Sequence, residues 1–122
     1  MDSILPIIVL LALGVPALVV QAITKSAAQG RTGRNAVAGI RIKPVTDSDE
    51  AWIAGHQAAL PIINALTLAQ IVLVVVSIVF FFMGKEQVVS TMLLIIPVVL
   101  LGFTAWATVK ARAAAQATLE TT

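Results

Sequence analysis

Three long stretches of this sequence contain no charged residue. They cover residues 4–24, 57–84 and 87–109. A helix rises about 1.5 Å per residue and needs about 20 apolar residues to cross a hydrocarbon core about 30 Å thick, so each stretch is long enough to span a membrane. Charged residues make up only 11% of the chain, against roughly 25% in soluble domains. The sequence therefore predicts an all-α integral membrane protein, a single domain built as a three-helix bundle.

The positive charges predict how this bundle is oriented. Lys and Arg close to the helix ends stay on the cytoplasmic side, whereas acidic residues have little influence. Seven basic residues lie on one side, and only Lys85 lies on the other. The seven are Lys25, Arg31, Arg34, Arg41, Lys43, Lys110 and Arg112. We therefore expect the N-terminus outside, spans at about 4–24, 62–83 and 88–109, a cytoplasmic loop at 25–61, a short outer turn at 84–87 and a cytoplasmic tail at 110–122.

The long loop ends in a predicted helix start. Asp47 can accept hydrogen bonds from the free N–H groups of a first turn, and Glu50 can reach back to complete a capping box. The residues that then recur on one helical face are Trp52, His56, Ala59 and Ile63. A single helix from 48 to 83 would be about 54 Å long, far more than the bilayer core requires. We therefore expect a short interfacial helix before the second span, with a bend at Pro61.

Polar residues gather on one face of the second span. They are Asn64, Thr67, Gln70 and Ser77. Because polar side chains are better satisfied by other helices than by lipid, this face is predicted to turn into the bundle. The three spans contain no Asp, Glu, Lys or Arg. That composition argues against an ion or proton pathway formed by this chain alone.

Catalysis and metal binding have few candidate side chains. The chain has no Cys, and its only imidazole is His56. The carboxylates of Asp49 and Glu50 lie roughly two helical turns from His56, too far for a direct hydrogen bond. The three or four ligands of a zinc site could come together only in an unusual geometry. We therefore expect no enzymatic activity, no metal and no cofactor.

The polar residues of the loop have two competing interpretations. Arg31, Arg34, Arg41 and Lys43 are each expected to contact anionic lipid headgroups, at about 1 kcal/mol per residue. Helix caps, an aromatic belt and such cations explain most of these residues singly. A recognition surface at the membrane explains them together. The net charge of +2 reflects the topology, and no nucleic-acid binding is expected.

One part of this loop carries an ordered motif. It reads Arg34-Asn35, then Gly39-Ile40-Arg41, then Ser48-Asp49-Glu50-Ala51-Trp52, and then His56. The motif resembles the signature of the SdpI family, bacterial membrane proteins named for an immunity protein against a secreted killing peptide. The resemblance covers about residues 33–59 and implies a location in the bacterial plasma membrane. The chain departs from the family pattern at Ile42, Pro44, Gly55 and Gln57. The site residues that the resemblance implies are Asn35, Gly39, Arg41, Ser48, Glu50, Trp52 and His56.

Three functions remain open from the sequence. The resemblance implies a non-enzymatic protein that binds a peptide or protein partner, in immunity or signalling against a secreted antimicrobial peptide. An alternative is a small accessory subunit of a larger membrane complex, such as respiratory or envelope-synthesis machinery. A third, small-molecule transport, would need a polar cavity from Asn64, Thr67 and Gln70, completed by a homo-oligomer or larger assembly.

Overall fold

The computed structural model describes residues 3–120 as three long helices joined by a folded loop and a tight turn. Helix α1 runs Leu5–Ala28, α2 runs Asp49–Phe82 and α3 runs Glu86–Glu120, and a 3-10 turn, η1, covers Val45–Asp47. All three helices are long and apolar enough to cross a membrane. No strand occurs among residues 3–120. The prediction of an all-α chain with three membrane-spanning helices is confirmed.

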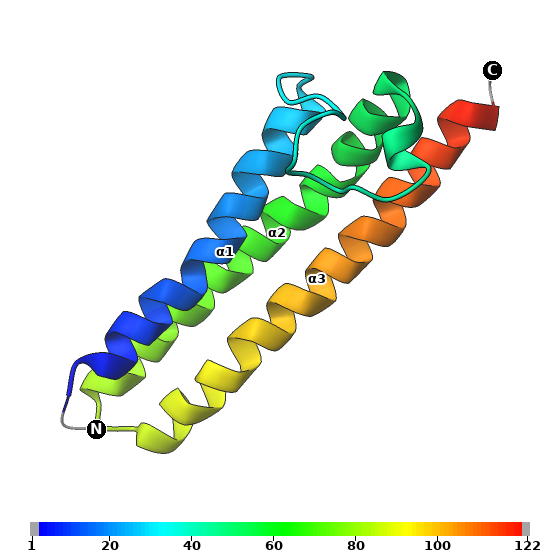
Figure 1. Cartoon of the computed structure of the whole chain (residues 1–122). Coiled ribbons are helices and arrows are strands. Elements are labelled where there is room, and N and C mark those ends of the chain that lie inside the picture. The colour runs from blue at the N-terminus through cyan, green and yellow to red at the C-terminus, as the bar shows by residue number, and fades with distance from the viewer. Residues whose placement is uncertain (1–2, 121–122) are drawn as a thin grey trace.

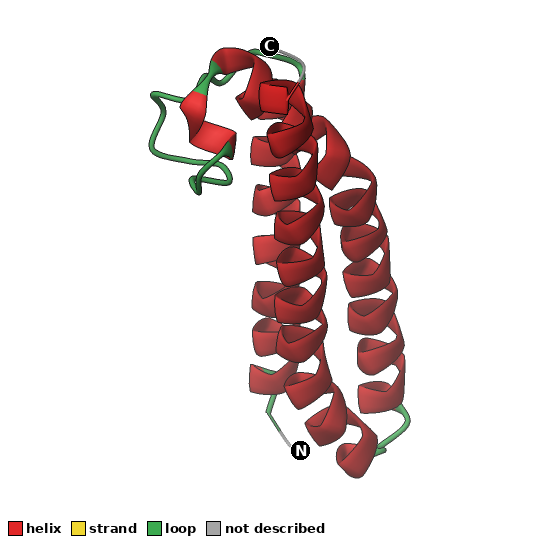
Figure 2. Cartoon of the chain, turned by 90° about the vertical axis from the view of Figure 1, so that its right-hand side faces the viewer, coloured by secondary structure: helices red, strands yellow, loops and turns green. Residues whose placement is uncertain are grey.

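Helix α2 lies at the centre of the packing. It contacts both α1 and α3 extensively, whereas α1 and α3 touch each other only slightly. Figure 1 shows the helices side by side, with the loop of residues 29–48 folded over one end of the bundle. Figure 2 shows that this loop projects to one side of the helix ends. We call this end the loop end, and the end with residues 83–85 the turn end.

Small residues let α2 and α3 approach closely at the loop end. Ala107, Ala111 and Ala115 follow one another at intervals of four residues on α3, and all three are buried. A side chain on Gly55 would lie 3.2 Å from the Ala111 carbonyl oxygen. Such small-residue contacts are typical of helix pairs in membranes, where close backbone approach supplies the packing energy. A larger residue at position 55 would therefore require Val45 or the Ala111 backbone to shift by a few tenths of an ångström.

The start of α2 differs from the prediction by one residue. Ser48, not Asp47, is the N-cap: its backbone is extended, and its hydroxyl accepts a hydrogen bond from the Ala51 N–H at 3.0 Å. Asp47 belongs to η1, and its carboxylate lies 3.7 Å from the Lys43 ammonium. Because the residue three positions after Ser48 is an alanine, the reciprocal capping-box bond from Glu50 does not form.

The separate interfacial helix that we expected before Pro61 is not present as its own element. Helix α2 continues through Pro61 without a break from Asp49 to Phe82. Ala59 and Ile63, on either side of the proline, are buried in the same core cluster, so packing supports the helix on both sides of Pro61. The hydrogen bond that proline removes would have joined it to Gln57, and both residues are exposed. With 34 residues, α2 is about 51 Å long and exceeds the bilayer core.

Candidate functional site

The loop is fixed to the first turns of α2 by a buried tryptophan. Trp52 is 1% exposed, and its indole N–H donates to the carbonyl oxygen of Thr32 at 2.7 Å. Its ring lies 4.3 Å from the ring of His56, centroid to centroid, at a tilt of 46°. An aromatic side chain with one polar atom can thus be buried without leaving that atom unpaired.

His56 is fully buried, and both of its ring nitrogens have partners. Nδ1 lies 2.8 Å from the Trp52 carbonyl oxygen, and Nε2 lies 3.0 Å from the backbone nitrogen of Ile40. A carbonyl oxygen can only accept and an amide N–H can only donate, so Nδ1 carries the proton and Nε2 accepts. This arrangement requires the neutral imidazole. His56 lies ahead of the predicted span at 62–83, and burial lowers its pKa below 6.5, although the bond to Trp52 opposes the shift.

Gly39 is the point where the loop passes closest to these rings. Its φ is +118°, a backbone conformation that residues with side chains rarely adopt. A Cβ at this position would lie 2.6 Å from Cη2 of Trp52 and 3.1 Å from Nε2 of His56. The absence of a side chain therefore allows the next residue, Ile40, to present its N–H to His56.

Two arginines hold the rest of the loop in shape. Arg34 donates from Nε to the Asp49 carboxylate at 3.0 Å, and from Nη1 to the carbonyl oxygens of Thr46 and Asp47. Arg41 donates from Nη1 to the carbonyl oxygens of Arg34, at 2.8 Å, and of Ala36. These bonds join distant parts of the loop to the start of α2. We use the name loop clamp for the set Thr32, Arg34, Gly39, Ile40, Arg41, Ser48, Trp52 and His56.

The motif residues thus divide into two groups. Five of the expected site residues take part in the loop clamp: Gly39, Arg41, Ser48, Trp52 and His56. The side chains of the other two, Asn35 and Glu50, are exposed, and neither forms a hydrogen bond or ion pair with residues 3–120. Neither Thr32 nor Ile40 was among the expected site residues, because Thr32 acts through its carbonyl oxygen and Ile40 through its backbone N–H, and neither group depends on the side chain.

The polar residues of α2 contact both neighbouring helices. Gln21 of α1 donates to the Asn64 side-chain oxygen at 2.9 Å, and the Thr67 hydroxyl lies 3.4 Å from the carbonyl oxygen of Ala17. Gln70 is fully buried and donates to the Ile96 carbonyl oxygen of α3 at 2.9 Å. Its own side-chain oxygen is buried without a partner among residues 3–120. Three residues of the predicted polar face, Thr67, Gln70 and Ser77, are therefore buried in the bundle. Asn64 is exposed, and its bond to Gln21 links α2 to α1 at the edge of the bundle.

The basic residues expected at lipid headgroups differ in what they contact. Arg34 is bound to Asp49, and Lys43 lies 3.7 Å from Asp47. Arg31 and Arg41 are exposed at the surface of the loop. Among residues 3–120, no group of three His, Cys, Asp or Glu residues could hold a metal ion.

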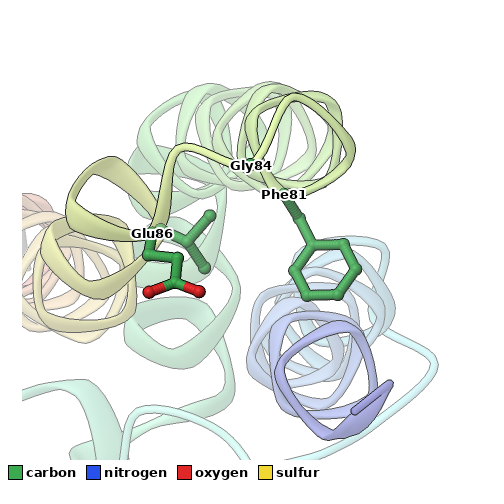
Figure 3. Close-up of a pocket in the computed structure, with 4 residues that line it drawn as sticks. Phe81, Gly84 and Glu86 are labelled. Atoms are coloured by element: carbon green, nitrogen blue, oxygen red, sulfur yellow. The ribbon is translucent and has the colours of Figure 1, made fainter. Parts of the chain in front are cut away.

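A small pocket lies at the opposite end of the bundle. Figure 3 shows Phe81 of α2 and Glu86 of α3 on its two sides, next to the turn at Gly84. Its volume is about 30 Å³, which is room for only one or two water molecules. Two larger clefts, each of about 250 Å³, lie beside the loop.

Comparison with known protein families gives a match over most of the chain. Residues 31–109 match the family model described as the SdpI/YfhL protein family. The match includes the whole motif, α2 and most of the apolar part of α3. A search of curated proteins found no significant match. A search of solved structures found none either.

Proposed function

The chain belongs to the SdpI/YfhL protein family, and on that premise we propose that this multi-pass membrane protein acts by binding, without catalysing a reaction. Its partner is a secreted antimicrobial peptide against which it gives immunity, and the protein lies in the bacterial plasma membrane with its loop end in the cytoplasm. The observation that supports binding most directly is the loop clamp. It uses most of the motif to fix the shape of one end of the bundle.

The state of His56 favours binding over catalysis. A general base needs a free nitrogen within hydrogen-bond reach of its substrate. Both nitrogens of His56 are bonded to backbone groups, and the side chain is fully buried. In this proposal the imidazole is a structural part of the clamp. The rigid bundle then offers a fixed surface to an amphipathic peptide.

Asn35 and Glu50 are the residues through which we propose that the loop end contacts a cytoplasmic signalling protein. Both belong to the motif, both are exposed, and the loop clamp does not use them. An exposed carboxylate that forms no internal ion pair is available to a basic side chain of a partner. Signalling is therefore the second candidate function, beside immunity.

Survival of cells challenged with a killing peptide tests the immunity proposal. Cells that lack the gene should become sensitive, and expression of the full chain should restore growth. Clamp variants such as Trp52→Ala should abolish protection together with membrane abundance. If no peptide secreted by sibling strains kills the deletion strain, the immunity proposal fails.

Extraction in mild detergent followed by a pull-down tests the signalling proposal. Asn35→Ala and Glu50→Gln should each lose the captured protein while membrane abundance stays unchanged. Glu120→Gln is the matched control, because it removes an exposed carboxylate outside the motif. Co-migration of the wild-type chain with several stoichiometric subunits on a native gel would instead favour the accessory-subunit function.

A further inference from the structure

The loop returns alongside α1 after it leaves that helix. In Figure 1 the cyan part of the loop runs beside α1, below the end of the helix, before it crosses to α2. The segment 37–40 lines a cleft whose other wall belongs to α1 and consists of Val20, Ile23 and Thr24. The cleft has a volume of about 250 Å³, and most of its lining is apolar. Part of the loop therefore lies beside residues of the predicted first span.

Helix contacts show that this part of α1 is level with Trp106 of α3. Gln57 of α2 donates to the carbonyl oxygen of Ala28, and two residues earlier α2 packs on the carbonyl oxygen of Ala111. Ala28 and Ala111 are therefore at about the same height along the bundle. Since α1 and α3 run in the same direction, the residues five positions before them, Ile23 and Trp106, are level as well.

Trp106 marks the edge of the predicted third span. It is half-exposed and lies one turn before Lys110, and tryptophans at the ends of spans gather at the headgroups. On α1, the uncharged run ends at Thr24, and Lys25 follows at nearly the same height. Both helices thus place the boundary between acyl chains and headgroups beside the segment 37–40.

The composition of this part of the loop suits that boundary. Residues 35–40 carry no charge, and Val37 among them is 96% exposed, more than any other large apolar residue in the described part of the chain. An exposed valine gains free energy from contact with hydrocarbon. The segment is neither helix nor strand, so its backbone groups must stay within reach of water. A position at the boundary meets both requirements.

The loop clamp fixes both ends of the segment. Ile40 donates its N–H to His56, and Arg41 donates to the carbonyl oxygen of Ala36. These bonds hold the backbone on each side of Val37. The height of Val37 relative to the helices is therefore set by the fold.

We propose that the segment 36–40 is an interfacial membrane anchor. Val37 inserts into the leaflet at the loop end, at the boundary between acyl chains and headgroups, and a phospholipid acyl chain fills the cleft against α1. Because these contacts are apolar, a zwitterionic lipid such as phosphatidylcholine is sufficient. The anchor goes beyond the proposed function and does not rest on it, since it sets the height of the loop whatever partner the protein binds.

The depth of position 37 in a bilayer tests the anchor. The chain has no Cys, so Val37→Cys in the full-length protein can carry a single NBD fluorophore, whose emission moves to shorter wavelength outside water. The labelled protein is placed in phosphatidylcholine nanodiscs. We expect emission at shorter wavelength than in water, and quenching by phosphatidylcholine that carries a nitroxide on its acyl chain. Comparison of nitroxides at two positions of the chain gives the depth of the label.

Two exposed positions whose heights follow from the helix rise are the matched controls. Val19→Cys lies on α1 four residues before Ile23, so its label should be about 6 Å deeper than the label at position 37. Ala113→Cys lies on α3 seven residues beyond Trp106, and its label should emit as in water and escape quenching. The label at position 37 should be quenched more by the shallow nitroxide than by the deep one.

A substitution without a label gives a second measurement. Val37→Asp places a carboxylate at the edge of the acyl chains, which is costly, and should speed protease cleavage within residues 29–48 in the same nanodiscs. Val37→Leu is the control, because it keeps an apolar side chain at the same position and should leave the cleavage rate unchanged. If position 37 faced water, both substitutions would be neutral, since the side chain makes almost no contact within the protein.

Two results of the labelling experiment would overturn the anchor. One is a label at position 37 that emits like the label at position 113 and escapes quenching, which would place the loop in water. The other is emission at short wavelength without quenching by either nitroxide lipid, which would show that protein covers Val37. Neither result changes the expected outcome of the survival and pull-down experiments, so failure here is distinguishable from failure of the proposed function.

Discussion

Position 39 is where the smallest change should have the largest effect on the loop. Gly39→Ala would place a Cβ 2.6 Å from the Trp52 ring at a φ of +118°. We expect a loss of about 1–3 kcal/mol in stability, because the substitution strains the backbone and also overpacks the space beside Trp52. Thermal unfolding in detergent measures it. Gly33→Ala is the control: a Cβ there meets nothing within 4 Å, and it should be nearly neutral. Equal effects of the two substitutions would contradict the close approach.

His56 makes the loop clamp sensitive to pH. Burial lowers the pKa of His56 in the folded loop below 6.5. As the pH falls, the unfolded loop therefore binds more protons than the folded loop does. The stability that His56 contributes is therefore complete above about pH 6.5 and decreases below it. Protonation would also remove the acceptor for the Ile40 N–H. We expect protease cleavage within residues 29–48 to be faster at pH 5 than at pH 7.5. The same dependence in His56→Gln would contradict this assignment.

At the scale of the helices, two neighbouring residues at the N-terminus of α2, Asp47 and Ser48, should differ in how much they stabilise the helix. Ser48 caps the helix through Ala51, whereas the Asp47 carboxylate lies 3.7 Å from the Lys43 ammonium. Ser48→Ala should lower the free energy of unfolding by about 1 kcal/mol, the usual cost of a lost cap. Asp47→Ala should change it by less, because exposed ion pairs contribute little. Chemical denaturation in detergent gives both free energies. A larger loss of stability in Asp47→Ala than in Ser48→Ala would indicate that Asp47 is the N-cap.

The helices could be predicted from the sequence because an uncharged, apolar run of about 20 residues is rarely anything other than a membrane-spanning helix. Helix ends were harder. The choice between Asp47 and Ser48 depends on backbone angles, and both residue types are good caps. Pro61 is predicted to separate an interfacial helix from the second span, but α2 continues through it, with Ala59 and Ile63 buried in one core cluster. Local propensity was thus overridden by packing.

The candidate site could be predicted only as a set of residues. The motif indicated Trp52 and His56, and the helical period placed them on one face, which is buried. Their partners could not be predicted, since Thr32 and Ile40 contribute backbone atoms. The exposure of Asn35 and Glu50 likewise depends on how the loop folds. The motif therefore predicted which residues form the candidate site. In the structure, most of these residues fix the loop to the start of α2.

For the whole molecule, the central place of α2 had no clear signal in the sequence. Each span is apolar on nearly all sides, so the amphipathic pattern that orders helices in soluble bundles is weak. The best guide was the polar face of α2, which bonds to Gln21 of α1 and to Ile96 of α3. A central helix contacts two other helices, and α2 carries polar side chains that form hydrogen bonds with both.

Orientation in the membrane is the remaining property of the whole molecule that charge predicts. Lys85 is the one basic residue at the turn end, and the other seven lie toward the loop end. Since the chain has no Cys, single cysteines can be introduced without background labelling. A membrane-impermeant maleimide should label Lys85→Cys in intact cells and label Arg31→Cys only after lysis, because basic flanks stay in the cytoplasm. Labelling of Arg31→Cys in intact cells would invert the topology and place the loop clamp outside, within direct reach of a secreted peptide.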